Sequence, residues 1–385
     1  MFFKRIKSEG LAHYAYFVGS DGEAAVIDPR RDCDVFLDMA NIESLKIKYI
    51  FETHRNEDYA IGSIELAHFT QAEIFHGPGL DWQYGTTLKD EQEFRIGNLK
   101  ITALHTPGHT DESTSYTLHD HASEELVMAF TGDTLFVGDV GRIDLYGLNE
   151  APRLAGNIYD SIFKKLLTLG DDVIIYPAHT RGSICGSNIS KREESTIGIE
   201  HKQNSLLQMD KITFIKYTVG EHHERPPYFR QMEKYNIEGP PLIQRLPTPP
   251  PLSPKDFKDK MDRGAVVLDT REPSAFSGAH IKDTYNIWLE GLPTFAGWVL
   301  PYEKPILLVL ENTQYLEKAV RYLVRLGYDN IAGYLRGGVE HQGAGIDDGY
   351  NTGFSVKHLE LITVQKFKEK INHGDAILIL DVRSE

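Results

Sequence analysis

Four side chains that can bind a metal ion each follow a short apolar run of the chain. His54 comes after residues 47–51, and three later runs end in His109, Asp133 and His179. Binding and catalytic groups are common in the loops that follow strands. Imidazole nitrogens and carboxylate oxygens are ligands for zinc and for non-heme iron. The pattern therefore predicts that these loops meet and hold a metal ion.

The segment that contains His54 reads THRNEDY. It resembles the T-H-x-H-x-D-H motif of the metallo-β-lactamase superfamily, with Asn56 and Tyr59 in place of two histidines. A two-metal hydrolase needs enough ligands for both cations, so these substitutions weaken both halves of such a site. His54, His109 and Asp133 remain. Two histidines and one carboxylate with open positions are the ligand set of mononuclear non-heme Fe(II) oxygenases.

Further segments extend the resemblance. They are HTPGHT at residues 105–110, TGDTLF at 131–136, GDVGRID at 138–144, YPAH at 176–179 and GSICG at 182–186. Together they resemble bacterial persulfide dioxygenases fused to rhodanese domains. In that family one iron is held at the positions of His54, His109 and Asp133. The resemblance implies one Fe(II) per chain, with zinc only as an adventitious ion, and oxidation by O2 of the sulfane sulfur of a low-molecular-weight thiol persulfide to sulfite, in sulfide detoxification.

The other polar residues near the motif are expected to support the iron. Asn56, Asp58, Tyr59 and His179 can orient ligands or hydrogen-bond substrate, and Tyr59 is counted among the catalytic candidates. Asp58 and His179 could alternatively be remnants of a second metal site.

Two further residues are catalytic candidates with open alternatives. Arg142 could anchor a carboxylate or phosphate of the thiol carrier through its guanidinium, or it could form a structural ion pair with Asp139 or Asp144. Cys185, in a glycine-rich loop, could carry or receive persulfide sulfur, or it could be a small buried hydrophobe. Cys33 is assigned no role.

Composition divides the chain near a proline-rich segment. Residues 240–254 contain seven prolines and predict an extended linker. The N-terminal part mixes strand and helix patterns, and the resemblance implies an αββα metallo-β-lactamase sandwich over residues 1–239. An α/β rhodanese-like domain is expected over 255–355, and the partial start of a second rhodanese repeat over 356–385.

The resemblance to rhodanese domains depends on a sequence segment that occurs twice. GAVVLDTRE begins at Gly264, and a similar segment ending in ILILDVRSE closes the chain; Gly278 to Ile281 supplies the family's Gly-x-His-Ile segment. The loop at residues 311–315 has no cysteine, and none occurs after Cys185. Without a thiol nucleophile the domain is predicted to be inactive as a sulfurtransferase. We expect a truncated or shortened chain, whose parent could hold that cysteine beyond residue 385.

Charge and hydropathy exclude several classes of partner. The net charge of −15 disfavours nucleic acid, and no apolar run is long enough to predict a membrane span. Two cysteines in 385 residues fit a reducing, cytoplasmic compartment. We expect a homo-oligomer that uses a small thiol persulfide and O2. The alternatives are a glyoxalase II-like thioester hydrolase and a non-catalytic sulfur-binding scaffold.

Overall fold

The computed structural model describes residues 1–121, 123, 125–186, 188–221, 223–337, 354–360, 362–374 and 376–380. They form two compact units. The first comprises Met1–Thr248, Glu290–Glu303 and Glu317–Ile331, and the second comprises Pro249–Leu289, Lys304–Leu316 and Ala332–Glu385. The boundary at Thr248 falls inside the predicted linker. The return of residues 290–303 and 317–331 to the first unit was not predicted from the sequence.

Two six-stranded sheets form the centre of the first unit. The strands of the first sheet, in spatial order, are β1 (Phe2–Ser8), β2 (His13–Ser20), β3 (Glu23–Ile27), β4 (Lys46–Phe51), β5 (Glu73–His76) and β6 (Thr86–Thr87). The second sheet runs β12 (Ser195–Thr196), β11 (Ile174–Pro177), β10 (Leu126–Gly132), β9 (Thr114–Asp120), β8 (Leu99–His105) and β7 (Glu93–Ile96).

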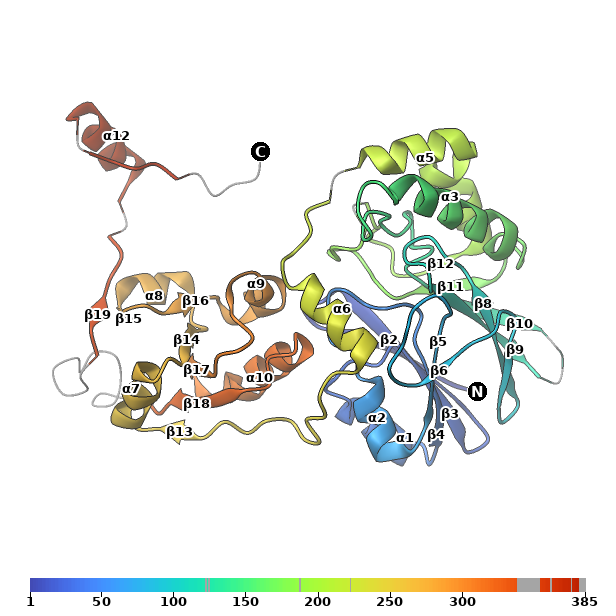
Figure 1. The fold of residues 1–385 in the computed structure, drawn as a ribbon, viewed down its shortest axis with the longest axis horizontal. Helices are drawn as coiled ribbons and strands as arrows, with labels where there is room; N and C mark the ends of the chain where they lie inside the picture. The colour runs from blue at the N-terminus through green and yellow to red at the C-terminus, as the bar shows by residue number, and fades with distance from the viewer. Residues whose placement is uncertain are drawn as a thin grey trace. The chain divides into compact units, whose positions relative to one another are not determined.

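Helices cover the outer faces of both sheets, with α1 and α2 on the first and α3 and α5 on the second (Figure 1). The helices of this unit are α1 (Asp34–Ile42), α2 (Ser63–Thr70), α3 (Ala151–Ser161) with the π-helical turn η1 (Ile162–Leu166), α4 (Ile197–Gln203), η2 (Ser205–Gln208), α5 (Lys211–Gly220), α6 (Phe229–Glu238), η3 (Leu289–Gly291), α9 (Leu292–Val299) and α10 (Leu316–Arg325). The layers form the predicted αββα sandwich.

Alternating side chains explain how the sheets pack. On β4, Phe51 faces the aromatic core between the sheets, whereas Ile50 packs with α1 and α2. A register shift between β3 and β4, opposite Ala24 and Ala25, turns Ile47 to the same outer face as Ile50. Strands that are covered on both faces have nearly continuous apolar sequences, and for this reason the strand before His54 could be predicted from the sequence. Among the described residues, no helix has both the length and the apolar character needed to cross a bilayer.

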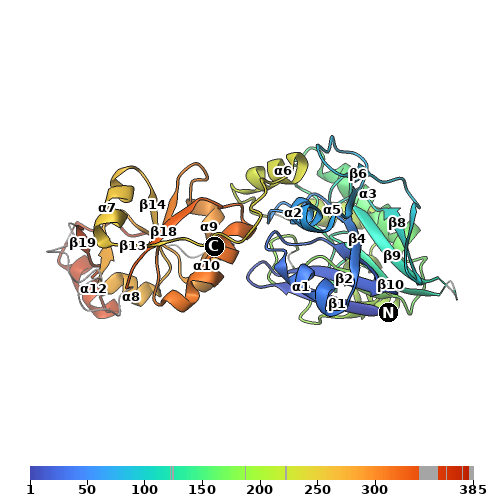
Figure 2. The same cartoon turned by 90° about the horizontal axis from the view of Figure 1, so that it is seen from below.

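The second unit contains a mainly parallel sheet in the order β13-β18-β17-β14-β16. Its elements are β13 (Pro251–Leu252), α7 (Pro254–Asp262), β14 (Val266–Asp269), α8 (Pro273–Gly278), β15 (His280–Ile281), β16 (Tyr285–Asn286), β17 (Ile306–Val309), η4 (Thr313–Tyr315), β18 (Ile331–Leu335), β19 (Val356–Lys357) and α12 (Val364–Asn372). Figure 2 shows α7 beside these strands. Phe257 of α7 is fully buried among strand residues.

The rhodanese-like turn is closed by a buried ion pair. Arg271 donates from Nε and Nη2 to the carboxylate of Asp269, at 2.7 to 3.1 Å. Near the C-terminus α12 forms, whereas residues 376–380 pair with no strand among the residues that the structure describes, and Leu378 is 94% exposed. An apolar run becomes a strand only beside another strand. The second Asp-x-Arg turn, at Asp381 and Arg383, lies outside the described residues.

Candidate metal centre

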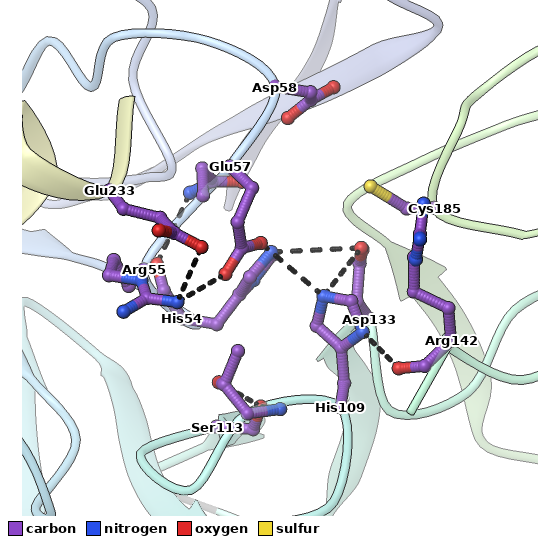
Figure 3. A network of polar contacts seen from close by, with 12 residues as sticks. His54, Arg55, Glu57, Asp58, His109, Ser113, Asp133, Arg142, Cys185 and Glu233 are labelled. Carbon is purple, nitrogen blue, oxygen red and sulfur yellow. Dashed lines mark hydrogen bonds and ion pairs between the residues drawn. The ribbon is translucent and has the colours of Figure 1, made fainter. Parts of the chain in front are cut away.

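The three predicted ligands lie on loops that leave the same edge of the sandwich. His54 follows β4 of the first sheet, whereas His109 and Asp133 follow β8 and β10 of the second. All three side chains are buried, with at most 2% exposure. Figure 3 shows the two imidazoles and the carboxylate pointing toward one another. Asp133 Oδ2 lies 3.6 Å from His54 Nε2 and 3.4 Å from His109 Nε2.

Hydrogen bonds on the far side of each ring fix which nitrogen faces the centre. His109 Nδ1 lies 2.8 Å from the carbonyl oxygen of Arg142, which can only accept, so Nδ1 carries the proton. His54 Nδ1 lies 2.9 Å from Thr53 Oγ1, whose own proton goes to Asp28 Oδ2 at 2.7 Å. In both neutral rings the Nε2 lone pair therefore faces Asp133. This is the usual way in which a protein orients metal-binding histidines.

Two glycines allow the loops to approach closely. Gly108 has φ of +148°, and a Cβ there would lie 2.3 Å from atoms of Ile158 on α3. A Cβ on Gly141 would lie 2.0 Å from the carbonyl oxygen of Asp133 and 2.9 Å from His109 Nδ1. Side chains at either position would push the ligand loops apart.

The inward-facing atoms have no hydrogen-bond partner within the part of the chain that the structure describes. His54 Nε2, His109 Nε2 and Asp133 Oδ2 are all buried and unpaired. Buried polar groups are normally satisfied, and three converging acceptors without a donor point to a bound cation. Two nitrogens and one carboxylate oxygen suit a first-row divalent ion such as iron or zinc. The residues therefore fit the metal that the fold family implies.

Burial and charge place these side chains in the protonation states that a metal requires. Burial lowers the pKa of His54 to about 3 and also lowers the pKa of His109. Burial alone would raise the pKa of Asp133, but the imidazoles of His179 and His54 outweigh it and hold that pKa well below its usual range. Neutral imidazoles and an ionised carboxylate are the forms that bind cations.

His179 and Asp58 form a polar chain beside Asp133. His179 Nδ1 lies 2.7 Å from Asp133 Oδ1, and its Nε2 lies 3.1 Å from Asp58 Oδ2. Burial opposes a charge on His179, but the carboxylates of Asp133 and Asp58 outweigh burial and raise its pKa well above the ordinary value. The imidazole thus links two carboxylates, which fits the predicted orienting role.

The two substituted motif positions are engaged elsewhere. Asn56 donates from Nδ2 to the carbonyl oxygen of His54 at 3.2 Å. The Tyr59 hydroxyl lies 2.9 Å from His13 Nε2, and His13 Nδ1 lies 3.0 Å from Ser8 Oγ. Tyr59 is fully buried, and its ring centroid is 4.3 Å from that of His13.

For Arg142 the structure shows the ion pair with Asp144. Its Nε and Nη2 each lie 2.7 Å from an Asp144 carboxylate oxygen, and its Nη1 donates to the carbonyl oxygens of Ile184 and Glu224. Four of its five N–H donors are therefore used within the protein, and anchoring a thiol carrier stays a prediction.

Cys185 is 1% exposed and packs with Phe136 and Ile189. Burial, reinforced by Asp58 and Asp133, raises the pKa of the Cys185 thiol well above its ordinary value. This environment matches the hydrophobic alternative, and the sulfur-carrying role stays a prediction.

Three buried residues near the centre were missed by the sequence analysis. Glu57 projects toward His109, and His13 pairs with Tyr59. Asn236 of α6 donates to the carbonyl oxygens of Asn56 and Tyr59 at 2.6 and 2.8 Å. His13 and Asn236 are far from the motif in sequence and carried no signal. The opposite charges of Arg55 and Glu57, two residues apart in the motif segment, could have drawn attention to Glu57.

Comparison with protein families matches each part of the chain. Residues 9–179 match the metallo-beta-lactamase superfamily, and residues 253–341 match the rhodanese-like domain. A hydroxyacylglutathione hydrolase of Tolumonas auensis is 32% identical over 43% of this chain and 61% of its own length. The human mitochondrial persulfide dioxygenase ETHE1 is 29% identical over 53% of this chain and 74% of its own length. The chain thus spans less than two thirds of the length of that hydrolase.

Two crystal structures are similar in fold. A metallo-beta-lactamase from Staphylococcus aureus superposes with a TM-score of 0.77 at 31% identity, covering 87% of this chain and 98% of that one. ETHE1 from Myxococcus xanthus gives 0.54 at 27% identity, covering 62% and 99%. The family matches and the first superposition agree with the sandwich and with the rhodanese-like domain. The chain therefore belongs to the metallo-beta-lactamase superfamily, with a rhodanese-like domain C-terminal to its metallo-beta-lactamase domain.

Proposed function

We propose that the first unit is an Fe(II)-dependent persulfide dioxygenase that oxidises the sulfane sulfur of a low-molecular-weight thiol persulfide to sulfite. The observation that carries this proposal is that the ligand atoms of the predicted iron site are unpaired, whereas those at the neighbouring position for a second cation are hydrogen-bonded. His54, His109 and Asp133 present unpaired ligand atoms to one point. The ring nitrogens of His179, where a second cation would bind, are both hydrogen-bonded to carboxylates.

The motif substitutions support a single-metal centre. Asn56 directs its amide nitrogen at a backbone carbonyl, and Tyr59 directs its hydroxyl at His13. A two-metal hydrolase positions its nucleophile between two cations. A single iron with open positions would instead supply redox chemistry with O2.

The side chains near the centre suit a sulfur substrate. Phe136, Cys185 and Ile189 form a buried apolar cluster, and the Phe136 ring centroid is 6.5 Å from that of His179. This cluster can exclude water and contact a polarisable sulfur. His179, held between two carboxylates, can hold a proton close to the reacting groups.

A neighbouring cleft could receive the carrier of the persulfide. It has a volume of about 490 Å³, and Ile189 lines both this cleft and the apolar cluster around Cys185. Arg181 and Lys191 also line it, and both are exposed. Two cations at its wall favour a thiol carrier with a carboxylate or phosphate group.

The rhodanese-like domain is assigned no sulfur transfer. The loop between β17 and α10 carries Asn312, whose side chain accepts from Gln314 N, rather than a thiol nucleophile. Its proposed contribution is packing, oligomerisation or substrate capture.

A thioester hydrolase is the second candidate. Single ligand atoms of Asp58, His179 and Cys185 lie within 4.8 Å of one another, which offers three donors for a second cation. Hydroxyacylglutathione hydrolases are also among the relatives of this chain. This candidate requires that a cation displace the hydrogen bonds of His179.

Oxygen uptake separates the candidates. Anaerobically purified protein of measured iron content is supplied with a panel of small-thiol persulfides, and O2 and sulfite are followed together. Uptake that scales with iron and yields sulfite supports the dioxygenase. Hydrolysis of acylated thiols that scales with two metal ions per chain, without oxygen uptake, favours the hydrolase.

A further inference from the structure

A fourth buried side chain projects toward the metal centre. Glu57 is fully buried, and its Oε2 lies 3.8 Å from His109 Nε2. Single ligand atoms of His54, Glu57 and His109 all lie within 4.8 Å of one another. Figure 3 shows the Glu57 carboxylate on the same side of His109 as His54.

The two oxygens of Glu57 have different surroundings. Oε1 accepts from Arg55 Nη2 at 3.0 Å. The same Nη2 lies 3.4 Å from Glu233 Oε1, which in turn accepts from Arg225 at 2.5 Å. Oε2 has no hydrogen-bond partner. Arg55 therefore holds the outer oxygen and leaves the inner one directed at the imidazoles.

One carboxylate oxygen of Glu57 and one of Asp133 each lie beside both imidazoles. The Nε2 lone pairs of His54 and His109 were assigned above from their far-side hydrogen bonds, and Asp133 Oδ2 and Glu57 Oε2 are unpaired oxygens. Burying a carboxylate oxygen without a partner is costly, on the order of several kcal/mol. A cation bound beside the two imidazoles would contact Glu57 Oε2 and remove that cost.

We propose that Glu57 is a fourth ligand of the metal ion, through Oε2, with Arg55 fixing its outer oxygen. The inference rests on the metal centre of the proposed function. The motif leaves residue 57 unspecified, so this carboxylate is a feature of this chain rather than of the motif. It lies on the same loop as Asn56, where the motif has a histidine.

A second carboxylate among the four ligands changes the charge of the centre. A divalent ion with two neutral imidazoles and Asp133 alone keeps one positive charge. Burial raises the pKa of Glu57 to about 8, so the ion would displace a proton from this carboxyl, and the ion and its ligands would then be neutral. A neutral centre attracts free anions less strongly, because the favourable Coulomb interaction in a buried site is lost.

Cobalt(II) provides a test that does not depend on turnover. Its dissociation constant is measured by competition with a chelator, and its visible spectrum reports the ligand set. We expect Glu57→Gln to weaken Co(II) binding by about tenfold or more and to shift the visible bands. Azide should bind more tightly to the Co(II) form of Glu57→Gln than to that of the wild type. Glu233→Gln is the matched control, because Glu233 contacts Arg55 but not the imidazoles, and it should leave all three values unchanged.

Two further variants separate the possible failures. If Glu57→Gln keeps the wild-type Co(II) affinity and spectrum while His109→Ala loses both, Glu57 is not a ligand and the metal centre stands. If His109→Ala binds Co(II) as the wild type does, the metal centre of the proposed function is itself wrong. If Glu57→Gln does not fold, Glu57→Asp keeps the charge but withdraws the oxygen by one methylene. Wild-type Co(II) affinity and spectrum in Glu57→Asp would overturn the assignment.

Discussion

Replacing Thr53 by valine tests whether a hydroxyl one residue before the first ligand controls that ligand. Thr53 is 1% exposed, and its Oγ1 donates to Asp28 Oδ2 and accepts from His54 Nδ1. Valine keeps the shape, which matters because a Cβ on Gly132 would lie only 2.7 Å from Thr53 Cβ. Only the two hydrogen bonds are removed. The backbone N–H of Thr53 still donates to Asp28 Oδ1.

The magnitude follows from these two bonds. A hydrogen bond to a carboxylate contributes about 1.5–3 kcal/mol and a neutral one about 0.5–1.5 kcal/mol, so Thr53→Val should lower the free energy of unfolding by about 2–4 kcal/mol. Burial already raises the pKa of Asp28 to about 7, with the Thr53 hydrogen bonds opposing it. Losing one of them raises that pKa further. Metal affinity should fall about 10- to 100-fold, because nothing then orients the His54 ring.

Thr53→Ser is the matched control. It keeps the hydroxyl and removes one methyl group, at a cost of about 1 kcal/mol of stability. Urea unfolding of the metal-free protein gives the stability change, and competition with a chelator gives the metal dissociation constant. We expect Thr53→Ser to bind metal as the wild type does. Equal metal affinity in Thr53→Val and Thr53→Ser would refute the claim that this hydroxyl orients His54.

Three further predictions concern buried side chains. Asn236→Ala should lower the free energy of unfolding by about 3 kcal/mol in a urea titration, because two carbonyl oxygens and the N–H of Ile61 lose their partner; a change below about 1 kcal/mol would contradict this. Cys33 and Cys185 should not react with a chromogenic disulfide at pH 8 until urea is added, because both thiols are buried and burial raises the pKa of each. The pKa of Cys33 is raised to about 12, so about 1 in 10,000 of its thiols is a thiolate at pH 8. Rapid labelling of the native protein would contradict this prediction. Arg142→Lys should lower Tm by a few degrees in a thermal melt, because lysine cannot reproduce the bidentate pair with Asp144.

The ligand positions could be predicted from sequence because each follows a strand. β4, β8 and β10 are buried strands whose apolar runs stand out, and the loops at their ends meet at one edge. That rule says where His54, His109 and Asp133 lie. It does not say how a loop side chain is oriented, and so the inward direction of Glu57 was not predicted.

Contacts between segments that are distant in the sequence could not be predicted either. His13 is 46 residues from Tyr59, and no periodicity links a residue at the start of β2 to a loop after β4. The amphipathic pattern of α10 predicts a helix with one buried face but does not specify which core that face covers. The apolar residues 376–380 illustrate the reverse case, since a strand pattern without a neighbouring strand stays exposed.

The origin of the ligands from both sheets has a mechanical consequence. His54 follows a strand of the first sheet, and His109 and Asp133 follow strands of the second. A bound ion would therefore cross-link the two sheets. The sheets could not separate without releasing the ion. At a free metal concentration 100 times the dissociation constant, such a cross-link raises the free energy of unfolding by about 2.7 kcal/mol. The supply of that metal ion would then affect the stability of the sandwich as well as its activity.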